Sequence, residues 1–158
     1  GINGMSYLKE LRKLVGHRPL LSAGATVLVI RDQKVLLNLR ADTHTWGIPG
    51  VGMELGESLE DTARRELAEE TGLCARELRL LTVFSGQDFY FEYPNGDKLY
   101  SVVALYRALQ VSGELRMTDG ESLALEYFAL DALPRLESRA KAVLSWVSAH
   151  KDLLGVDA

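Results

Sequence analysis

The stretch Val51–Leu73, VGMELGESLEDTARRELAEETGL, decides most of what can be inferred about the fold of this sequence. Seven acidic and two basic side chains lie between Glu54 and Glu70, which gives this segment a net charge of −5. The chain of 158 residues has a net charge of −4, so the other 141 residues sum to +1. The negative charge is therefore concentrated in one segment, and this concentration needs an explanation.

The second half of the stretch has the pattern of an amphipathic helix. Apolar residues recur every four positions and predict a buried stripe, formed by Leu59, Ala63 and Leu67. Ser58 can cap the amino end, and Asp61 completes a capping box three residues later. Gly72 suits the left-handed position after the last turn. We therefore expect a helix that begins after Ser58 and ends at Gly72.

Three glutamates lie on a second face of this predicted helix. Glu70 follows Glu66 by four residues and Glu69 follows it by three. Like charges at this spacing destabilise an isolated helix by roughly 0.2–0.5 kcal/mol per pair. Two explanations are open. Either the face is simply solvated, or the carboxylates bind a hard divalent cation such as Mg²⁺ or Mn²⁺, which prefers carboxylate oxygen.

The composition predicts one folded domain, which we place at residues 5–154, with residues 1–4 as a cloning remnant. Hydrophobic residues make up 47% and charged residues 25% of the chain, which is typical of globular proteins. The net negative charge argues against bulk attraction to nucleic acid or anionic lipid. The longest apolar run, 25–30, is far below the roughly 20 residues that cross a membrane. We expect a cytoplasmic protein that binds a small molecule, not nucleic acid or a membrane.

The rest of the chain predicts a mixture of strands and helices. Helices are expected at 6–15 and 136–151, besides the central one, and strands at 23–31, 34–40, 77–84, 88–93, 98–109 and 124–129. The glycine-rich stretch 46–52 is expected to form a short strand that leads into a loop. Turn residues at Asp32–Gln33 and Pro94–Asp97 indicate hairpins. Strands joined mostly by hairpins, with helices at the ends and in the middle, favour an α+β fold, an α/β/α sandwich around a mixed sheet.

The spacing of the central segment resembles the Nudix box, the 23-residue signature of a hydrolase family. That box reads G, five residues, E, seven residues, R-E-U, one residue, E-E, one residue, G-U, where U is a bulky aliphatic residue. Glu57, then seven residues, then Arg65–Leu73 fit it, and eight of its nine specified positions match. The departure is Val51, which stands in place of the first glycine and is flanked by Gly50 and Gly52. The resemblance extends over about 22–133.

The resemblance implies an enzyme that cleaves pyrophosphate linkages of nucleoside diphosphate derivatives with Mg²⁺, or alternatively Mn²⁺. In such an enzyme the metal neutralises the phosphates and activates water, and no protein nucleophile is needed. The metal ligands implied are Glu66, Glu69 and Glu70, with a backbone carbonyl from Gly50 or Val51.

The resemblance also implies roles for residues around these ligands. Arg65 would orient the carboxylates through charge-assisted hydrogen bonds, and Glu69 is counted with the catalytic residues. Glu57 would hold or activate the water. Glu121, in a loop after the box, and Glu57 are alternative general bases. Glu54 has no role in this scheme.

The substrate is less defined than the chemistry. Tyr90 lies 17 residues beyond Leu73, which is similar to the tyrosine marker of dinucleoside polyphosphate hydrolases, although the alternating aromatic residues around it favour ordinary sheet packing. Arg40 is a candidate phosphate ligand or a surface arginine. Dinucleoside polyphosphates, ADP-ribose-like compounds and nucleoside triphosphates remain candidates. The alternative function is a catalytically weak nucleotide-sensing module. The N-terminal helix either forms a homodimer contact or packs on its own sheet.

Overall fold

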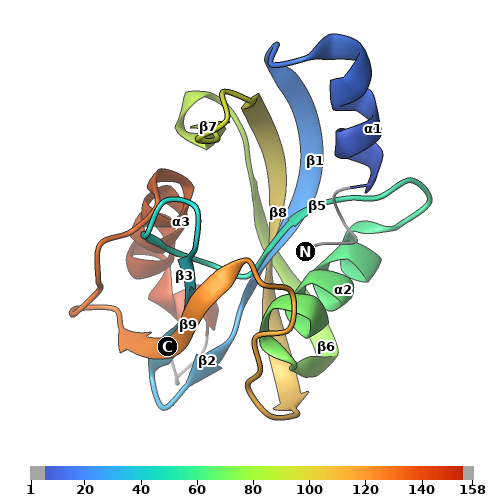
Figure 1. Ribbon diagram of the computed structural model, residues 1–158. Coiled ribbons are helices and arrows are strands. Elements are labelled where there is room, and N and C mark those ends of the chain that lie inside the picture. The colour runs from blue at the N-terminus through green and yellow to red at the C-terminus, as the bar shows by residue number, and fades with distance from the viewer. Residues whose placement is uncertain (1–5, 155–158) are drawn as a thin grey trace.

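The computed structural model describes residues 6–154, so the interpretation of residues 1–4 as a cloning remnant falls outside the described residues. The α-helices are α1 (Ser6–Val15), α2 (Leu59–Thr71) and α3 (Ser138–Ala149). The strands are β1 (Leu20–Leu28), β2 (Ile30–Arg31), β3 (Lys34–Arg40), β4 (Trp46–Gly47), β5 (Gly50–Gly52), β6 (Cys74–Phe84), β7 (Tyr90–Glu92), β8 (Lys98–Ser112) and β9 (Ser122–Ala129). Short 3-10 helices follow at η2 (Gln87–Phe89) and η3 (Lys151–Leu154) (Figure 1).

The strands form two sheets. The larger has the order β5-β1-β8-β6, with β7 also paired to β8, and the smaller has the order β2-β3-β4, with β9 paired to β3. Strands β1 and β8 run parallel, whereas β6 and β7 run antiparallel to β8. The larger sheet is therefore mixed, as the sequence predicted.

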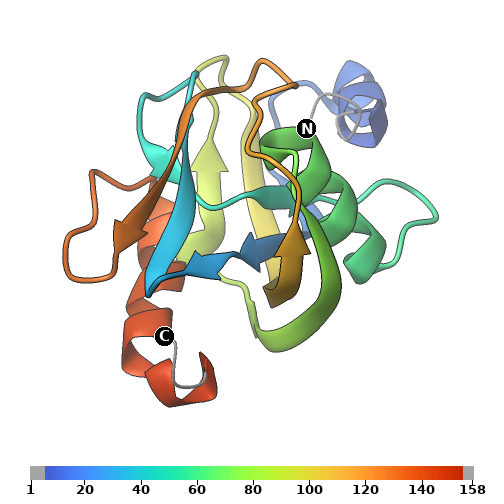
Figure 2. The same ribbon diagram turned by 90° about the horizontal axis from the view of Figure 1, so that it is seen from below.

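Two helices cover opposite faces of these strands. Ala63 of α2 packs in one hydrophobic cluster with Val27 of β1. Leu144 of α3 packs in a second cluster with Leu28 of β1. Successive side chains of β1 thus face α2 and α3 in turn, as the two-residue period of a strand requires. Figures 1 and 2 show the strands between the two helices, so the predicted α/β/α sandwich is confirmed.

The signals at the ends of α2 are also confirmed. The Ser58 hydroxyl accepts a hydrogen bond from the Asp61 N–H, and the Asp61 carboxylate accepts one from the Ser58 N–H, both at 3.0 Å. Gly72 has φ +78° and donates its N–H to the Ala68 carbonyl. Because these signals are local in sequence, they fix the ends of the helix independently of the rest of the fold.

One strand pairing differs from the expectation. The strand expected at 23–31 begins at Leu20 and is divided, and only its last part, β2, forms the hairpin with β3. Strand β1 pairs instead in parallel with β8, from Leu20↔Leu99 to Leu28↔Arg107. The physical reason is that the second half of β1, residues 24–28, is buried on both faces, which suits an interior strand covered by helices rather than a two-stranded hairpin.

Other boundaries shift by a few residues. The stretch 46–52, expected as a short strand leading into a loop, forms two short strands, β4 and β5, and the strand expected at 88–93 begins as η2 before β7. The hairpin at 94–97 is confirmed, with Gly96 at φ +94°. Among the described residues, no helix combines the length and the apolar character needed to cross a membrane.

Candidate functional site

Helix α2 buries two carboxylates next to its apolar stripe. Glu66 is 1% exposed and Glu70 is 7% exposed. Burying a charged group is costly unless it is paired or hydrogen-bonded. The N–H of Gly50 in β5 donates to Glu70 Oε2 at 2.6 Å, so the strand before the helix stabilises one of these carboxylates directly.

Arg65 connects the carboxylates of this region. Its Nε and Nη2 donate to Glu57 at 2.6 and 2.9 Å, and its Nη1 donates to Glu66 Oε1 at 2.6 Å. A longer contact of 3.5 Å joins Nη1 to Glu69 Oε2. Arg65 Nη2 also donates to the Gly52 carbonyl at 2.8 Å. One guanidinium therefore fixes the helix, the preceding loop and strand β5 relative to one another.

The pKa values of Glu57 and Glu70 are shifted in opposite directions. Hydrogen bonds from Arg65 lower the pKa of Glu57 to about 2, with further help from the Glu54 N–H and the Thr62 hydroxyl. By contrast, burial raises the pKa of Glu70 well above its usual value, and the neighbouring charge of Glu66 adds to this effect. Glu57 is thus ionised at neutral pH as the partner of Arg65, whereas the charge on Glu70 needs a compensating cation.

The loop after β8 brings two further acids to this place. The loop is fastened to the end of α2, because the Arg116 N–H donates to the Thr71 carbonyl at 2.9 Å and the Thr118 hydroxyl donates to the Glu69 carbonyl at 2.7 Å. Carboxylate oxygens of Glu70, Asp119 and Glu121 lie within 4.8 Å of one another. Asp119 Oδ2 is buried and has no hydrogen-bond partner within the described part of the chain. Such a group is suited to bind something that the protein itself does not supply.

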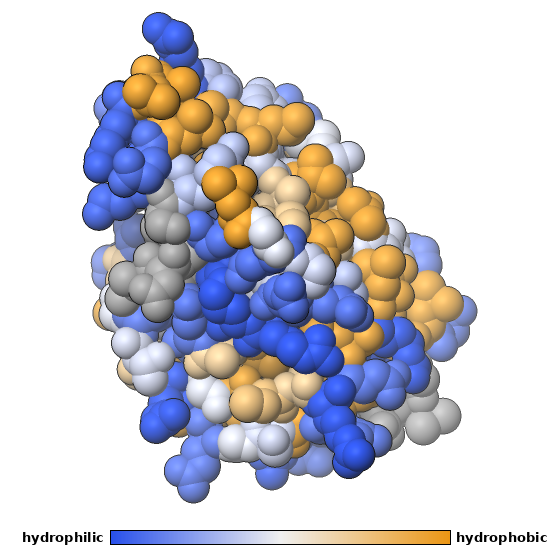
Figure 3. All heavy atoms as spheres, turned by 90° about the vertical axis from the view of Figure 1, so that its right-hand side faces the viewer, coloured by the Kyte–Doolittle hydropathy of each residue, from blue (hydrophilic) through white to orange (hydrophobic). Residues whose placement is uncertain are grey.

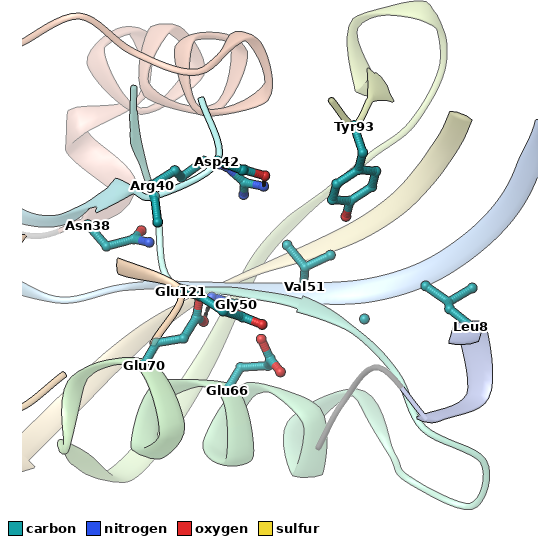
Figure 4. A pocket seen from close by; sticks show the side chains of 12 residues that line it. Leu8, Asn38, Arg40, Asp42, Gly50, Val51, Glu66, Glu70, Tyr93 and Glu121 are labelled. Carbon is teal, nitrogen blue, oxygen red and sulfur yellow. Dashed lines mark hydrogen bonds and ion pairs between the residues drawn. The ribbon is translucent and has the colours of Figure 1, made fainter. Parts of the chain in front are cut away.

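A cavity of about 410 Å³ is lined by the carboxylates of Glu66, Glu70 and Glu121 (Figure 4). Its lining comes from α1, the β3–β5 region, α2, the turn after β7 and the loop before β9, through Leu8, Asn38, Arg40, Ala41, Asp42, Gly50, Val51, Gly52, Glu66, Glu70, Tyr93 and Glu121. Glu66, Glu70 and Glu121 lie on one side of the cavity, and Tyr93 and Arg40 lie on the other. This combination of acidic, basic and apolar groups suits a ligand with phosphates and a ring system.

The comparison with known proteins decides the family. A family model, the NUDIX domain, matches residues 20–147. The chain belongs to the Nudix family. It is accordingly a pyrophosphohydrolase, an enzyme of the class that the sequence predicted.

Individual Nudix relatives support the assignment. The chain is 33% identical over 142 residues to the ADP-ribose pyrophosphatase of Methanocaldococcus jannaschii, covering 84% of this chain and 79% of that protein. It is 32% identical over 111 residues to the oxidized purine nucleoside triphosphate hydrolase of Mus musculus, covering 68% and 66%. The crystal structure of a MutT NUDIX hydrolase from Burkholderia pseudomallei matches with a TM-score of 0.69 and 31% identity, covering 81% of this chain and 98% of that chain.

The structure brings most of the predicted Nudix residues together. Arg40, Gly50, Glu66, Glu70 and Glu121 line the cavity. The remaining box residues, Glu57, Arg65 and Glu69, do not line it but belong to the hydrogen-bond network of Arg65.

Tyr90 is not brought to the cavity. Its hydroxyl donates to Glu92 at 3.2 Å, and its ring centroid lies 5.0 Å from that of Tyr100. Tyr93, three residues later, lines the cavity instead. Arg40 does line it, but its guanidinium is held by Asp42 through bonds of 2.9 and 2.7 Å.

Sequence reasoning missed several residues of the site. Asp119 carries a weak signal, an acid two residues before the predicted Glu121, and its Oδ1 accepts the Glu121 N–H at 3.0 Å. Leu8 gave no signal beyond its helical spacing. Glu54 now has a structural role, because its Oε1 accepts the Tyr7 N–H at the start of α1 at 3.0 Å. These roles depend on contacts between distant segments, which spacing alone does not reveal.

Proposed function

We propose that the protein hydrolyses a pyrophosphate linkage in a nucleoside diphosphate derivative, using water and Mg²⁺ or Mn²⁺. The observation that carries the proposal is that the carboxylates of Glu66, Glu70 and Glu121 line one cavity, and that Asp119 lies within 4.8 Å of the last two. The relatives are named for ADP-ribose and for an oxidized purine nucleoside triphosphate. ADP-ribose-like compounds, nucleoside triphosphates and dinucleoside polyphosphates are therefore the substrate classes to test.

The donor groups fit a hard divalent cation. They are carboxylate oxygens, one of which, Asp119 Oδ2, is buried without a partner among residues 6–154. Glu66 and Glu70, which line the cavity, would hold the ion with the Gly50 carbonyl, and Glu69 stays the third predicted ligand. When bound, the ion supplies positive charge that neutralises phosphate oxygens and acidifies water.

The side chains around the ion have separate tasks. Arg65 holds Glu57 and Glu66 in fixed positions. Because Glu57 is tied to Arg65 and does not line the cavity, we assign it a positioning role. Glu121 lines the cavity, so it is the better candidate to accept a proton from the attacking water. Arg40 lies on the opposite wall, which supports its role as the residue that contacts a phosphate.

A substrate panel with product identification tests this function. Adenosine triphosphate, ADP-ribose and diadenosine tetraphosphate would be incubated with Mg²⁺ or Mn²⁺, and the products separated by ion-exchange chromatography. We expect Glu70→Gln to lower turnover by about 100-fold or more. Glu60→Gln is the matched control, because it removes the same charge from an exposed position of the same helix. Tight binding of nucleotides without any product would instead favour the nucleotide-sensing module.

Three further expectations from the sequence stay predictions. They are a single hydrolase domain over 5–154, a cytoplasmic location, and the homodimer through the N-terminal helix. Figure 3 shows hydrophobic side chains gathered at the α1 end of the face that carries α1 and α2. Leu14 of α1 is 84% exposed. Sedimentation velocity of the purified protein with Leu14→Ser as the comparison would detect a dimer that uses this surface.

A further inference from the structure

The cavity wall opposite the acidic residues is built around a phenylalanine that is not part of the hydrophobic core. Phe91 of β7 is 7% exposed, yet it belongs to neither core cluster of the described residues. Two guanidinium groups lie over its ring, that of Arg40 at 5.0 Å and that of Arg139 at 4.2 Å from the ring centre. Tyr93 meets the same ring edge-to-face, with a centroid distance of 4.7 Å. Phe91 therefore contacts two residues that line the cavity, Arg40 and Tyr93.

Arg139, in the first turn of α3, reaches this ring at an energetic cost. The residue is 6% exposed, and a buried guanidinium must be compensated. Glu137, the capping residue of α3, accepts its Nε–H at 2.8 Å and also accepts the Ala140 N–H at 3.2 Å. The Nη1 of Arg139 is buried and has no hydrogen-bond partner within residues 6–154. Because a buried ion pair contributes little to stability on balance, the position of Arg139 needs a different explanation.

The guanidinium of Arg40 is held in one orientation by two different contacts. Asp42 accepts hydrogen bonds from its Nε and Nη2 at 2.9 and 2.7 Å, which fixes one edge of the planar group. Phe91 packs against its face. An edge contact and a face contact together determine the orientation of a planar group. The Nη1 of Arg40 makes no hydrogen bond to the described residues, so it is the donor that is left for a ligand in the cavity.

We propose that Phe91 and Arg139 are positioning residues of the cavity. Phe91 holds Arg40 and Tyr93 on the wall opposite the carboxylates (Figure 4). Arg139 in turn holds the ring of Phe91 from α3. A cation within about 6 Å of a ring centre is attracted to the ring face, and more strongly where water is excluded. The purpose of this arrangement, binding of an anionic substrate by Arg40, rests on the proposed function.

Replacement of the ring tests the first step. Phe91→Leu keeps an apolar side chain but removes the ring face. With the nucleotide that the wild type cleaves fastest, we expect the KM to rise by about 5-fold or more, because Arg40 is misplaced. The kcat should change by less than about 2-fold, since the carboxylates are untouched. Phe84→Leu is the matched control. Phe84 packs on the rings of Phe89 and Trp146 and does not line the cavity, so its KM is expected to stay unchanged.

A double variant separates positioning from stability. Glu137→Gln with Arg139→Met removes both buried charges, while glutamine keeps an acceptor for the Ala140 N–H. The Tm is expected to equal or exceed that of the wild type, because replacing a buried ion pair by uncharged groups of similar volume is often neutral or stabilising. The KM should nevertheless rise as in Phe91→Leu.

The conservative variant Arg139→Lys keeps a cation for the ring and for Glu137. It is expected to recover most of the wild-type KM. An unchanged KM in both Phe91→Leu and the double variant would overturn the proposal. A fall in kcat as large as the fall in kcat/KM would also overturn it, because the two residues would then act on the chemical step and not on the binding wall.

An NMR measurement makes the test independent of turnover. A proton near a ring face is shifted by the ring current, so the Nε–H resonance of Arg40 reports its place over Phe91. The resonance is assigned by its loss in Arg40→Lys. We expect it to move in Phe91→Leu and in the double variant, and to stay in place in Phe84→Leu. If the wild type cleaves no nucleotide, the proposed function fails, but these shifts still decide whether Phe91 and Arg139 hold Arg40. A resonance that does not move in the double variant would overturn the role of Arg139.

Discussion

Arg65 and Glu57 form a two-point ion pair, with Nε donating to Oε2 at 2.6 Å and Nη2 donating to Oε1 at 2.9 Å. The same guanidinium also binds Glu66 on the helix and the Gly52 carbonyl in β5. The pair therefore links the loop before α2 to the helix and to the strand beneath the cavity. Only a planar group with several donors can make these contacts at once.

Replacement of Arg65 by lysine should therefore be costly. A lysine ammonium cannot bind Glu57 at two points and reach Glu66 and Gly52 as well. We expect Arg65→Lys to lower the free energy of unfolding by about 2 kcal/mol and to reduce turnover. Urea denaturation measures the first effect. Arg64→Lys is the control, since Arg64 is exposed and makes one bond of 3.4 Å. Equal losses in both variants would contradict the role given to Arg65.

The same pair predicts a dependence of stability on pH. The pKa of Glu57 is about 2 in the folded protein and about 4.5 when unperturbed. The stabilisation is therefore fully present above pH 4.5 and is lost as the pH falls from 4.5 toward 2. We expect the stability advantage of the wild type over Glu57→Gln to shrink by on the order of 2–3 kcal/mol across this window. If the difference in stability between the wild type and Glu57→Gln does not change with pH, Glu57 is not held ionised by Arg65.

The sequence predicted those parts of the molecule whose signals are local. The caps of α2, the turn at Gly96 and the pattern of box carboxylates all lie within a few residues of the structures they specify. The parallel pairing of β1 with β8 joins residues about 80 positions apart, and no local signal encodes it. Asp119 is held at the site by contacts of its loop with distant segments, such as the hydrogen bond from Thr118 to α2. Spacing also identified Val51 as a departure from the box but could not show its place in the cavity.

The charge of Asp119 should favour metal binding but should not stabilise the protein when no metal is present. Its buried Oδ2 has no hydrogen-bond partner within residues 6–154 and lies in the cluster with Glu70 and Glu121. Asp119→Asn keeps an oxygen for the Glu121 N–H but removes the charge. We expect an equal or higher Tm without metal, and a smaller rise of Tm on adding Mg²⁺ or Mn²⁺ than in the wild type.

Differential scanning fluorimetry measures both Tm values, and Glu60→Gln serves again as the charge control. An unchanged metal-induced rise in Asp119→Asn would exclude Asp119 from the metal site. A marked loss of stability without metal would show that its charge is needed by the fold rather than by a ligand.

The contact between β1 and β5 predicts an intolerant glycine. The Cβ of Gly24→Ala would lie 2.2 Å from the Val51 carbonyl oxygen, and neither backbone can move without breaking the pairing. We expect a loss of about 2–4 kcal/mol in the free energy of unfolding. Gly52→Ala, whose Cβ would meet only Leu8 at 3.9 Å, is expected to lose far less. If Gly24→Ala and Gly52→Ala lose similar amounts of unfolding free energy, the close contact between β1 and β5 does not limit the residue at position 24.

Glu54 is expected to act on the cavity through helix α1. Its Oε1 accepts the Tyr7 N–H in the first turn of α1, and the next residue, Leu8, lines the cavity. Glu54→Ala removes this cap and should cost about 1 kcal/mol of stability, with a raised KM because Leu8 is less firmly held. Glu54→Gln keeps an oxygen acceptor, so both its loss of stability and its rise in KM should be smaller. If Glu54→Gln loses as much stability and raises the KM as much as Glu54→Ala, the effect comes from the charge of Glu54 and not from its hydrogen bond to Tyr7.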